Sequence, residues 1–142
     1  MMSETSMNVD IVVPNQTRYL RLIGNIAEQI AKELEADAYD QDTLAYHLNL
    51  VLTEAVANAI EYAGSKRPDE TVKVCLSIAD KEILIRVYDH GQGFDIARVP
   101  PPDVDHLSER GRGIFFIRNL MDSVDYRKAD DGNVLEMRKT LK

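Results

Sequence analysis

Two runs of strictly alternating apolar residues, separated by only two residues, constrain the fold of this chain more than any other feature. The positions that share a face are Val72, Val74, Leu76 and Ile78 in the first run and Ile83, Ile85 and Val87 in the second. A period of two is typical of a strand with one buried face. Asp80-Lys81 between the runs indicates a tight hairpin turn. The chain is therefore expected to build an antiparallel sheet with one apolar face, covered by helices.

The remaining periodic segments predict the elements on either side of this hairpin. They are a short edge strand over residues 7–13 closed by Pro14, a helix from about Gln16 to Ala36, a helix from about Thr43 to Ala63 ended by Gly64 and Pro68, an apolar helix over 114–121, and strands around Val124–Arg127 and Val134–Thr140. The apolar stripe of the first helix consists of Tyr19, Leu22, Ile23, Ile26, Ile30 and Leu34. Three helices on one face of a mixed, mostly antiparallel sheet give an α+β fold, an α/β two-layer sandwich.

Length and composition favour a single globular domain over residues 1–142, with 44% hydrophobic and 29% charged residues. The net charge of −7 argues against a nucleic-acid-binding surface. We expect neither a signal peptide nor a membrane span, because no apolar run of the required length is present. Cys75 is the only cysteine, which excludes an internal disulfide and fits a reducing cytoplasm. His47, His90 and His106 lack the spacing of metal ligands.

Two polar residues, Glu54 and Asn58, lie four apart near the end of the second predicted helix. At about 100° per residue they are roughly 40° apart, on one edge of the apolar stripe. A carboxylate beside an amide at the border of a core suits a site that needs a proton acceptor and a metal ligand. A solvated helix edge is the simpler interpretation of such a pair when it stands alone.

Asp89 ends the apolar face of the second alternating run. A carboxylate that faces a core is costly unless it is hydrogen-bonded, so Asp89 is expected to have a specific partner. That partner is either a backbone amide of the following turn or a donor on a ligand. Gly91 and Gly93 follow directly and permit a sharp turn with close backbone approach, although a lone Gly-x-Gly is a weak signal.

The segment from Asp95 to Arg110 carries three successive prolines and little periodicity. So long a connection without regular structure is unusual in a compact domain and is often an active-site lid. It leads into Gly111-Arg112-Gly113 and the apolar helix. A glycine-rich entry into a helix favours phosphate binding, because unpaired amides and the helix dipole attract anions. A plain hinge is the competing interpretation of these glycines.

Three motifs therefore occur in a fixed order: Glu54-x-x-x-Asn58 on a helix, Asp89-x-Gly91-x-Gly93 after a strand, and Gly111-x-Gly113 at a helix. The combination resembles the Bergerat-type ATP-binding fold of gyrase, Hsp90, histidine kinases and MutL, the GHKL superfamily. Within it the sequence is most similar to the anti-sigma-factor serine/threonine kinases of the RsbW and SpoIIAB type. Residues 54–63 resemble their N box, 89–95 their first glycine box and 111–114 their second. The resemblance covers nearly the whole chain.

This resemblance implies a role for each matching position. Asn58 would bind the Mg²⁺ that bridges the ATP phosphates, and Glu54 would be the catalytic base that accepts the proton of the substrate hydroxyl. Asp89 would accept a hydrogen bond from the adenine amino group. The remaining nucleotide-binding positions would be Gly91 and Gly93 around the adenine and Gly111, Arg112 and Gly113 around the phosphates, below an ATP lid at about 95–112.

The implied protein substrate is a serine or threonine of a STAS-domain anti-anti-sigma factor. The second implied partner is a sigma factor, held inactive while the antagonist is phosphorylated, and family members commonly form homodimers. An arginine of the first helix contacts partners in this family, and Arg18 and Arg21 both remain candidates.

Two other interpretations compete with this one. The chain could be an ATP-dependent binding module, or a switch kinase of a partner-switching pathway that does not itself sequester a sigma factor. Glu54 disfavours a pure binding module, since sequestration needs no base. The catalytic domain of a two-component histidine kinase is the other candidate. It is disfavoured because about 40 residues precede the N-box helix, without a phosphoacceptor histidine on a helical hairpin.

Overall fold

The computed structural model describes residues 6–34, 40–62, 70–89, 109–129 and 132–141, and the structural statements below concern these residues. In chain order the elements are β1 Met7–Pro14, the 3-10 helix η1 Thr17–Tyr19, α1 Leu20–Lys32, α2 Gln41–Tyr62, β2 Thr71–Ala79, β3 Glu82–Asp89, α3 Glu109–Leu120, β4 Ser123–Ala129 and β5 Gly132–Thr140. This is the predicted order of strands and helices. No helix in the described part of the chain is long and apolar enough to cross a bilayer.

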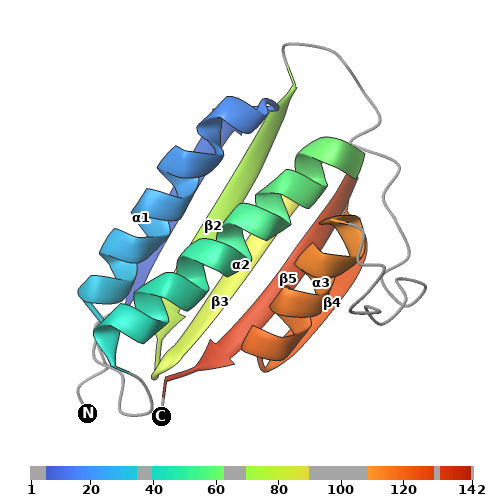
Figure 1. Cartoon of the computed structure of the whole chain (residues 1–142). Coiled ribbons are helices and arrows are strands. Elements are labelled where there is room, and N and C mark those ends of the chain that lie inside the picture. The colour runs from blue at the N-terminus through green and yellow to red at the C-terminus, as the bar shows by residue number, and fades with distance from the viewer. Residues whose placement is uncertain (1–5, 35–39, 63–69, 90–108, 130–131, 142) are drawn as a thin grey trace.

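The five strands form one sheet in the order β1-β2-β3-β5-β4, with β3 at its centre. The three α-helices lie side by side on one face of this sheet, so the molecule has two layers (Figure 1). The α+β class and the helix-covered sheet are thus confirmed. All four described strand pairings are antiparallel, so the sheet is not mixed as the prediction allowed.

The core lies between the helices and the sheet. Every apolar position of the two alternating runs is at most 8% exposed. The apolar stripe of α2 packs over β3 and is at most 5% exposed; it consists of Leu44, Leu48, Val51, Leu52, Ala55 and Ala59. The turn between β2 and β3 has positive φ at Asp80 (53°) and Lys81 (62°), as a two-residue type I′ hairpin requires. The hairpin that the alternation predicted is therefore present in the expected register, with Ile78 opposite Ile83.

The helix boundaries differ from those expected. The first predicted helix is split into η1 and a shorter α1, and Leu22 is 50% exposed, so its assignment to the core was wrong. α2 begins at Gln41 because the Asp40 side chain caps it, accepting hydrogen bonds from Thr43 N at 2.8 Å and Thr43 Oγ1 at 2.7 Å. The bond from the Thr43 amide holds the pKa of Asp40 below its usual value.

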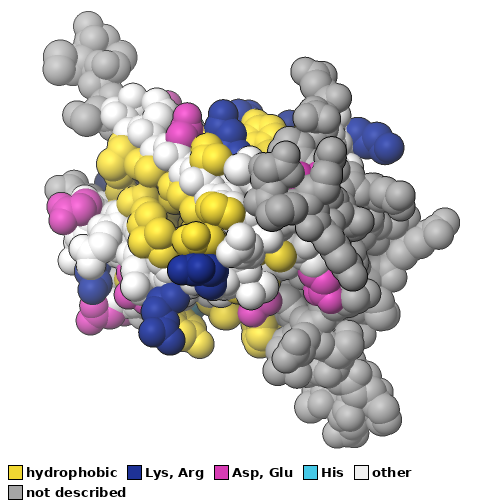
Figure 2. Space-filling model, turned by 90° about the horizontal axis from the view of Figure 1, so that it is seen from above, with side chains coloured by type: hydrophobic (Ala, Val, Ile, Leu, Met, Phe, Trp, Pro, Cys, Tyr) yellow, Lys and Arg dark blue, Asp and Glu magenta, His cyan; other side chains and the backbone are white. Residues whose placement is uncertain are grey.

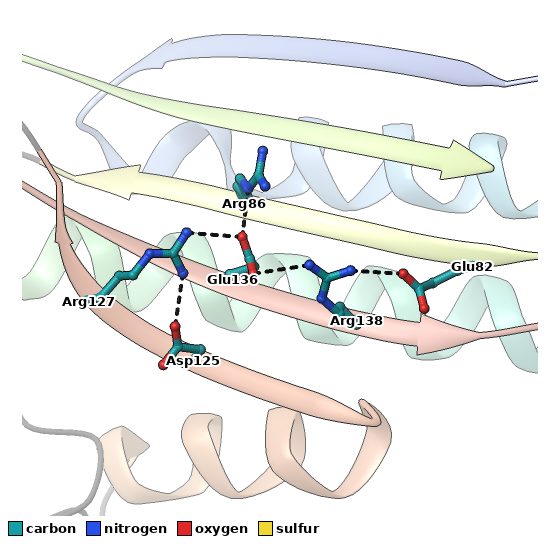
Figure 3. A network of polar contacts seen from close by, with 6 residues as sticks. All are labelled: Glu82, Arg86, Asp125, Arg127, Glu136 and Arg138. Carbon is teal, nitrogen blue, oxygen red and sulfur yellow. Dashed lines mark hydrogen bonds and ion pairs between the residues drawn. The ribbon is translucent and has the colours of Figure 1, made fainter. Parts of the chain in front are cut away.

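The face of the sheet opposite the helices carries a network of ion pairs across β3, β5 and β4 (Figure 3). Glu136, whose side chain is 12% exposed, accepts from Arg86 at 2.7 Å and from Arg127 at 3.2 Å, and it lies 3.5 Å from Arg138. The bond from Arg86 is the main reason that the pKa of Glu136 is lowered. Arg127 also pairs with Asp125 at 2.9 Å, and Arg138 with Glu82 at 3.0 Å.

Both ends of the described fold lie beside the β2–β3 turn. Met7, the first residue of β1, pairs with Ile78 near the end of β2, and Leu141 N donates to Lys81 O at 2.7 Å. Asp89 lies at the opposite end of β3, where it pairs with Asn133 at the start of β5.

Candidate functional site

Glu54 and Asn58 lie on α2 where this helix meets α3. Asn58 is 4% exposed and Glu54 is half-buried, so neither belongs to a fully solvated edge. The buried Nδ2 atom of Asn58 has no hydrogen-bond partner among the described residues. A buried amide with unused hydrogen-bonding capacity is costly in a folded protein unless a ligand or water completes its bonds.

Gly113 brings α3 against this pair. A Cβ atom added to Gly113 would lie 2.6 Å from Glu54 Oε2 and 3.5 Å from Asn58 Nδ2. A larger residue at this position would require the Glu54 carboxylate to move. The structure thus brings together two motifs that lie 55 residues apart in the sequence, from Asn58 to Gly113.

The second glycine pair is not a loop that precedes the helix, as the sequence suggested. α3 begins at Glu109, so Gly111 and Gly113 both lie within it. Two glycines weaken an isolated helix, but packing against α2 stabilises this one, and the small residue allows the close contact. The predicted lid at 95–112 accordingly overlaps the first turn of α3, and its remaining part, 95–108, lies outside the described residues.

Asp89 is 4% exposed at the end of β3, on the face that the helices cover. Its Oδ1 accepts a hydrogen bond from Asn133 Nδ2 at 2.9 Å, and its Oδ2 accepts one from the Tyr126 hydroxyl at 3.1 Å. Two side chains of the neighbouring strands β5 and β4 therefore satisfy this carboxylate. The sequence alone had suggested a ligand or a backbone amide of the following turn as its partner, and that turn lies outside the described residues.

Sequence reasoning missed Asn133 and Tyr126. Asn133 precedes the strand predicted from Val134, yet it is 3% exposed and directly opposite Asp89 in the β3–β5 register. One signal was available for Tyr126, which shares the period-two face of Val124. Neither contact could be predicted without the pairing of β5 with both β3 and β4, because these strands meet only in the folded sheet.

Several predicted site residues cannot be placed. Gly91 and Gly93 lie outside the described residues, as does His90. Gly111 and Arg112 are described only as part of α3. Their proposed contacts with adenine and phosphate remain predictions.

Other candidate chemistries find little support in the described residues. No group of three or more His, Cys, Asp or Glu side chains there could hold a metal ion. Burial raises the pKa of the Cys75 thiol, and a hydrogen bond with Asp10 adds to this effect, so the reactive thiolate is disfavoured.

Arg18 and Arg21, the two candidates for partner contact, are both exposed. The Arg18 guanidinium lies 5.3 Å from the ring centre of Tyr19. Seen from above the view of Figure 1, hydrophobic side chains gather next to Lys and Arg side chains on the described surface (Figure 2).

Polar side chains of α2 and of the end of the sheet provide oxygen ligands and hydrogen-bonding groups at this site. The amide oxygen of Asn58 and the Glu54 carboxylate are oxygen ligands of the kind that Mg²⁺ prefers. The Nδ2 donor of Asn58, which has no partner among the described residues, fits an acceptor atom of a ligand. Asp89 presents a carboxylate that hydrogen bonds from Asn133 and Tyr126 hold in place.

Comparison with known proteins places this arrangement among ATPase domains. Residues 13–139 match the sequence profile of the histidine kinase-like ATPase domain. The serine-protein kinase RsbW of Staphylococcus epidermidis is 27% identical over an alignment of 150 positions, gaps included. The alignment covers 99% of this chain and 91% of that protein. The protein of the same name from Bacillus subtilis is 26% identical over 124 residues, covering 82% of this chain and 75% of the relative.

Solved structures share the fold. The RsbU and RsbW domains of Rv1364c from Mycobacterium tuberculosis give a TM-score of 0.65 at 16% identity, over 95% of this chain and 32% of that one. The histidine kinase domain of a blue-light activated histidine kinase from Erythrobacter litoralis gives a TM-score of 0.52 at 20% identity, over 91% of this chain and 62% of that one. The chain thus spans about a third of the first and under two thirds of the second.

Proposed function

This chain belongs to the histidine kinase-like ATPase domain family, and on that premise we propose that it is a serine/threonine-protein kinase. It would transfer the γ-phosphate of ATP to a serine or threonine of a STAS-domain anti-anti-sigma factor, and it would bind and inhibit a sigma factor in a partner switch. The observation that carries the proposal is the half-buried Glu54 carboxylate, one helical turn from the buried Asn58 and against Gly113.

Asn58 would hold Mg²⁺ through its amide oxygen. This assignment follows from the family resemblance; the Nδ2 atom, which lacks a partner among the described residues, is a donor and would hydrogen-bond an acceptor atom of the ligand. When bound, the ion would neutralise charge on the ATP phosphates. Asn58 would therefore act in nucleotide binding.

Glu54 would accept the proton of the substrate hydroxyl as general base. Its position against Gly113 limits where the carboxylate can point, because the backbone of α3 closes one side of it. A base held in a fixed position loses less entropy when the substrate hydroxyl arrives.

Asp89 would accept a hydrogen bond from the adenine amino group, as the family resemblance implies, while Asn133 and Tyr126 hold its carboxylate in place. Gly91, Gly93, Gly111 and Arg112 would complete the nucleotide site, as the family resemblance implies. Residues 1–142 would form one kinase domain, closed over ATP by the lid at 95–112. It would act in the cytoplasm, as a homodimer.

The test is a phosphotransfer assay with purified protein, Mg-ATP and a STAS-domain protein from the same genome. Glu54→Ala should lower the transfer rate about 10²- to 10⁴-fold while ATP still binds, because the base acts only in the chemical step. Asn58→Ala should instead weaken Mg-ATP binding. Asp42→Ala is a matched control, since it removes an exposed carboxylate from the other end of α2.

Normal phosphotransfer by Glu54→Ala would show that the base is assigned wrongly. If the wild-type protein binds ATP and a sigma factor but no STAS protein accepts phosphate, it is an ATP-dependent binding module. If it phosphorylates a STAS protein but binds no sigma factor, it is a switch kinase.

A further inference from the structure

Lys139 is a buried cation at the end of the sheet that lies away from Asp89. It is 3% exposed and pairs with the core residue Ile83, so it lies on the face of β5 that the helices cover. Its Nζ atom donates a hydrogen bond at 2.5 Å to the carbonyl oxygen of Leu120, the last residue of α3. The carbonyl end of a helix carries partial negative charge, so an ammonium group there is stabilising. Lys139 thus fastens the last turn of α3 to the sheet.

His47 is a half-buried residue of α2 at the same end of the molecule. It precedes Glu54 by seven residues, so the two side chains leave α2 only about 20° apart, and Glu54 is the residue that faces Gly113 of α3. The two helices run in opposite directions (Figure 1). Since Leu120 follows Gly113 by seven residues, the same two turns lead along α3 to its last turn. His47 therefore faces the end of α3 that Lys139 holds.

The charged and titratable groups around His47 come from three elements. Burial lowers the pKa of His47 from its ordinary value of 6.5, the charge of Lys139 on β5 lowers it further, and Asp40 at the start of α2 opposes both. The ring of Tyr46 lies 6.0 Å from the imidazole, between ring centres. Arg118 in the last turn of α3 is exposed, so solvent screens its charge. A protonated His47 would add a second positive charge near the buried ammonium, where the low dielectric strengthens repulsion.

We propose that His47 and Lys139 form an acid-sensitive latch that holds the C-terminal end of α3. The latch is closed while the imidazole is neutral, with the Lys139 ammonium on the Leu120 carbonyl. When His47 takes up a proton from solvent, the two cations repel each other and the last turn of α3 is released. The same helix carries Gly113 against Glu54, so opening the latch also disturbs the candidate site. The inference is independent of the proposed kinase activity, because it concerns only how α3 is held.

The direction of the pH effect follows from linkage. His47 binds a proton less readily in the closed latch than in an open one, where it has its ordinary pKa of 6.5. The closed state is therefore fully favoured above pH 6.5, and the open fraction rises as the pH falls below that value. The rise is at most about tenfold for each pH unit, the limit for one proton, and it ends below the pKa of the closed state.

The first experiment measures the pKa of His47 in the whole chain by NMR titration of its imidazole Cε1–H signal, which the variant His47→Gln identifies by its loss. The pKa should lie below 6.5 in the wild type and should rise in Lys139→Met, which removes the charge. Lys128→Met is the matched control, since Lys128 is an exposed lysine of β4, and it should leave the pKa unchanged. A wild-type pKa at or above 6.5, or no rise in a folded Lys139→Met, would overturn the latch.

The second experiment compares amide hydrogen exchange in the last turn of α3 at about pH 7.5 and about pH 5.5, after correction for the intrinsic exchange rates. The open fraction should rise by up to about tenfold in the wild type and stay nearly constant in His47→Gln. An equal rise in His47→Gln would show that another group controls the end of α3, and the proposal would fail. This comparison also decides the matter if Lys139→Met does not fold.

Discussion

At the scale of the single residue, Gly113 is the position where the smallest change should have the largest effect. In Gly113→Ala the new methyl group would lie 2.6 Å from Glu54 Oε2, so the carboxylate must move. We expect the phosphotransfer rate to fall about 10- to 100-fold, because a displacement of about 1 Å removes a base from its working position. ATP affinity should change less, since Asn58 Nδ2 is further away, at 3.5 Å.

A stability measurement separates this effect from misfolding. Alanine is a better helix former than glycine by about 1 kcal/mol, so Gly113→Ala should unfold at a similar or higher temperature than the wild type while its rate falls. Full activity in this variant would show that Glu54 has room to adjust or is not the base.

The residues of the candidate site were predictable from the sequence only where they are part of a local pattern. Glu54 and Asn58 are four apart on one helix, and Asp89 ends an alternating run, so each shows in a short window. Asn133 and Tyr126 show no such pattern, because their role depends on strands that pair across 37 to 44 residues. The contact of Gly113 with Glu54 depends on how closely α3 packs against α2.

At the scale of the element, the β2–β3 turn holds a non-glycine residue in the left-handed region at both positions. Lysine is disfavoured there, whereas Asp-Gly is a preferred type I′ pair. Lys81→Gly should therefore raise the free energy of unfolding by about 0.5–1 kcal/mol, measured by urea denaturation. The Lys81 carbonyl, which accepts from Leu141 N, is retained.

Lys128→Gly is the contrasting variant. Lys128 is an exposed residue within β4, where glycine weakens a strand, so this change should lower the free energy of unfolding. If Lys81→Gly also lowers it, the contacts of the Lys81 side chain outweigh the strain of its backbone.

Helices and strands with a strong hydrophobic period were predicted correctly, but the residues at which they begin and end were not. The alternation of β2 and β3 and the stripe of α2 dictate type and facing, because each apolar side chain must be buried. The start of α2 depends on one capping side chain, Asp40, and the start of α3 depends on tertiary packing. Neither the cap nor the packing changes the hydrophobic period of the sequence, so the period does not reveal where these two helices begin.

At the scale of the whole molecule, the ion-pair network connects three strands on the sheet face opposite the three described helices (Figure 3). Glu136→Gln removes its central carboxylate, and we expect a loss of about 1 kcal/mol in the free energy of unfolding at pH 7. The value is modest because the arginine partners are 39–47% exposed and screened by solvent.

The pH dependence of this loss has a defined sign. The pKa of Glu136 is lowered in the folded protein, chiefly by its bond with Arg86, from an ordinary value of 4.5. As the pH falls below 4.5, the unfolded chain takes up the proton first, and the contribution of Glu136 disappears as the pH passes through the lowered folded pKa. Thermal unfolding of the wild type and Glu136→Gln should therefore differ at pH 7 and converge below pH 4.5.

Asp125→Asn serves as the control for the network. Asp125 is 65% exposed and is joined in Figure 3 to Arg127, so its loss should change the unfolding temperature little. An effect as large as that of Glu136→Gln would mean that the network acts through overall charge instead of through its central carboxylate.

The two-layer architecture followed from the sequence because the alternating runs and helical stripes each present one apolar face. The ion-pair network on the opposite sheet face did not follow from the sequence. Each of its charged residues, taken singly, is typical of a solvated position, and only the strand register places Arg86 beside Glu136.

The position of the chain ends has a practical consequence for experiments and for larger proteins that contain such a domain. Met7 and Leu141 lie beside the β2–β3 turn, whereas Asp89 lies at the far end of β3, about 25 Å away along a strand of eight residues. A fluorescent tag, a surface tether or a neighbouring domain joined at either end would thus emerge away from the proposed nucleotide site. Immobilising the protein by its ends should leave ATP binding intact, which makes tethered binding assays suitable for comparing the variants proposed above.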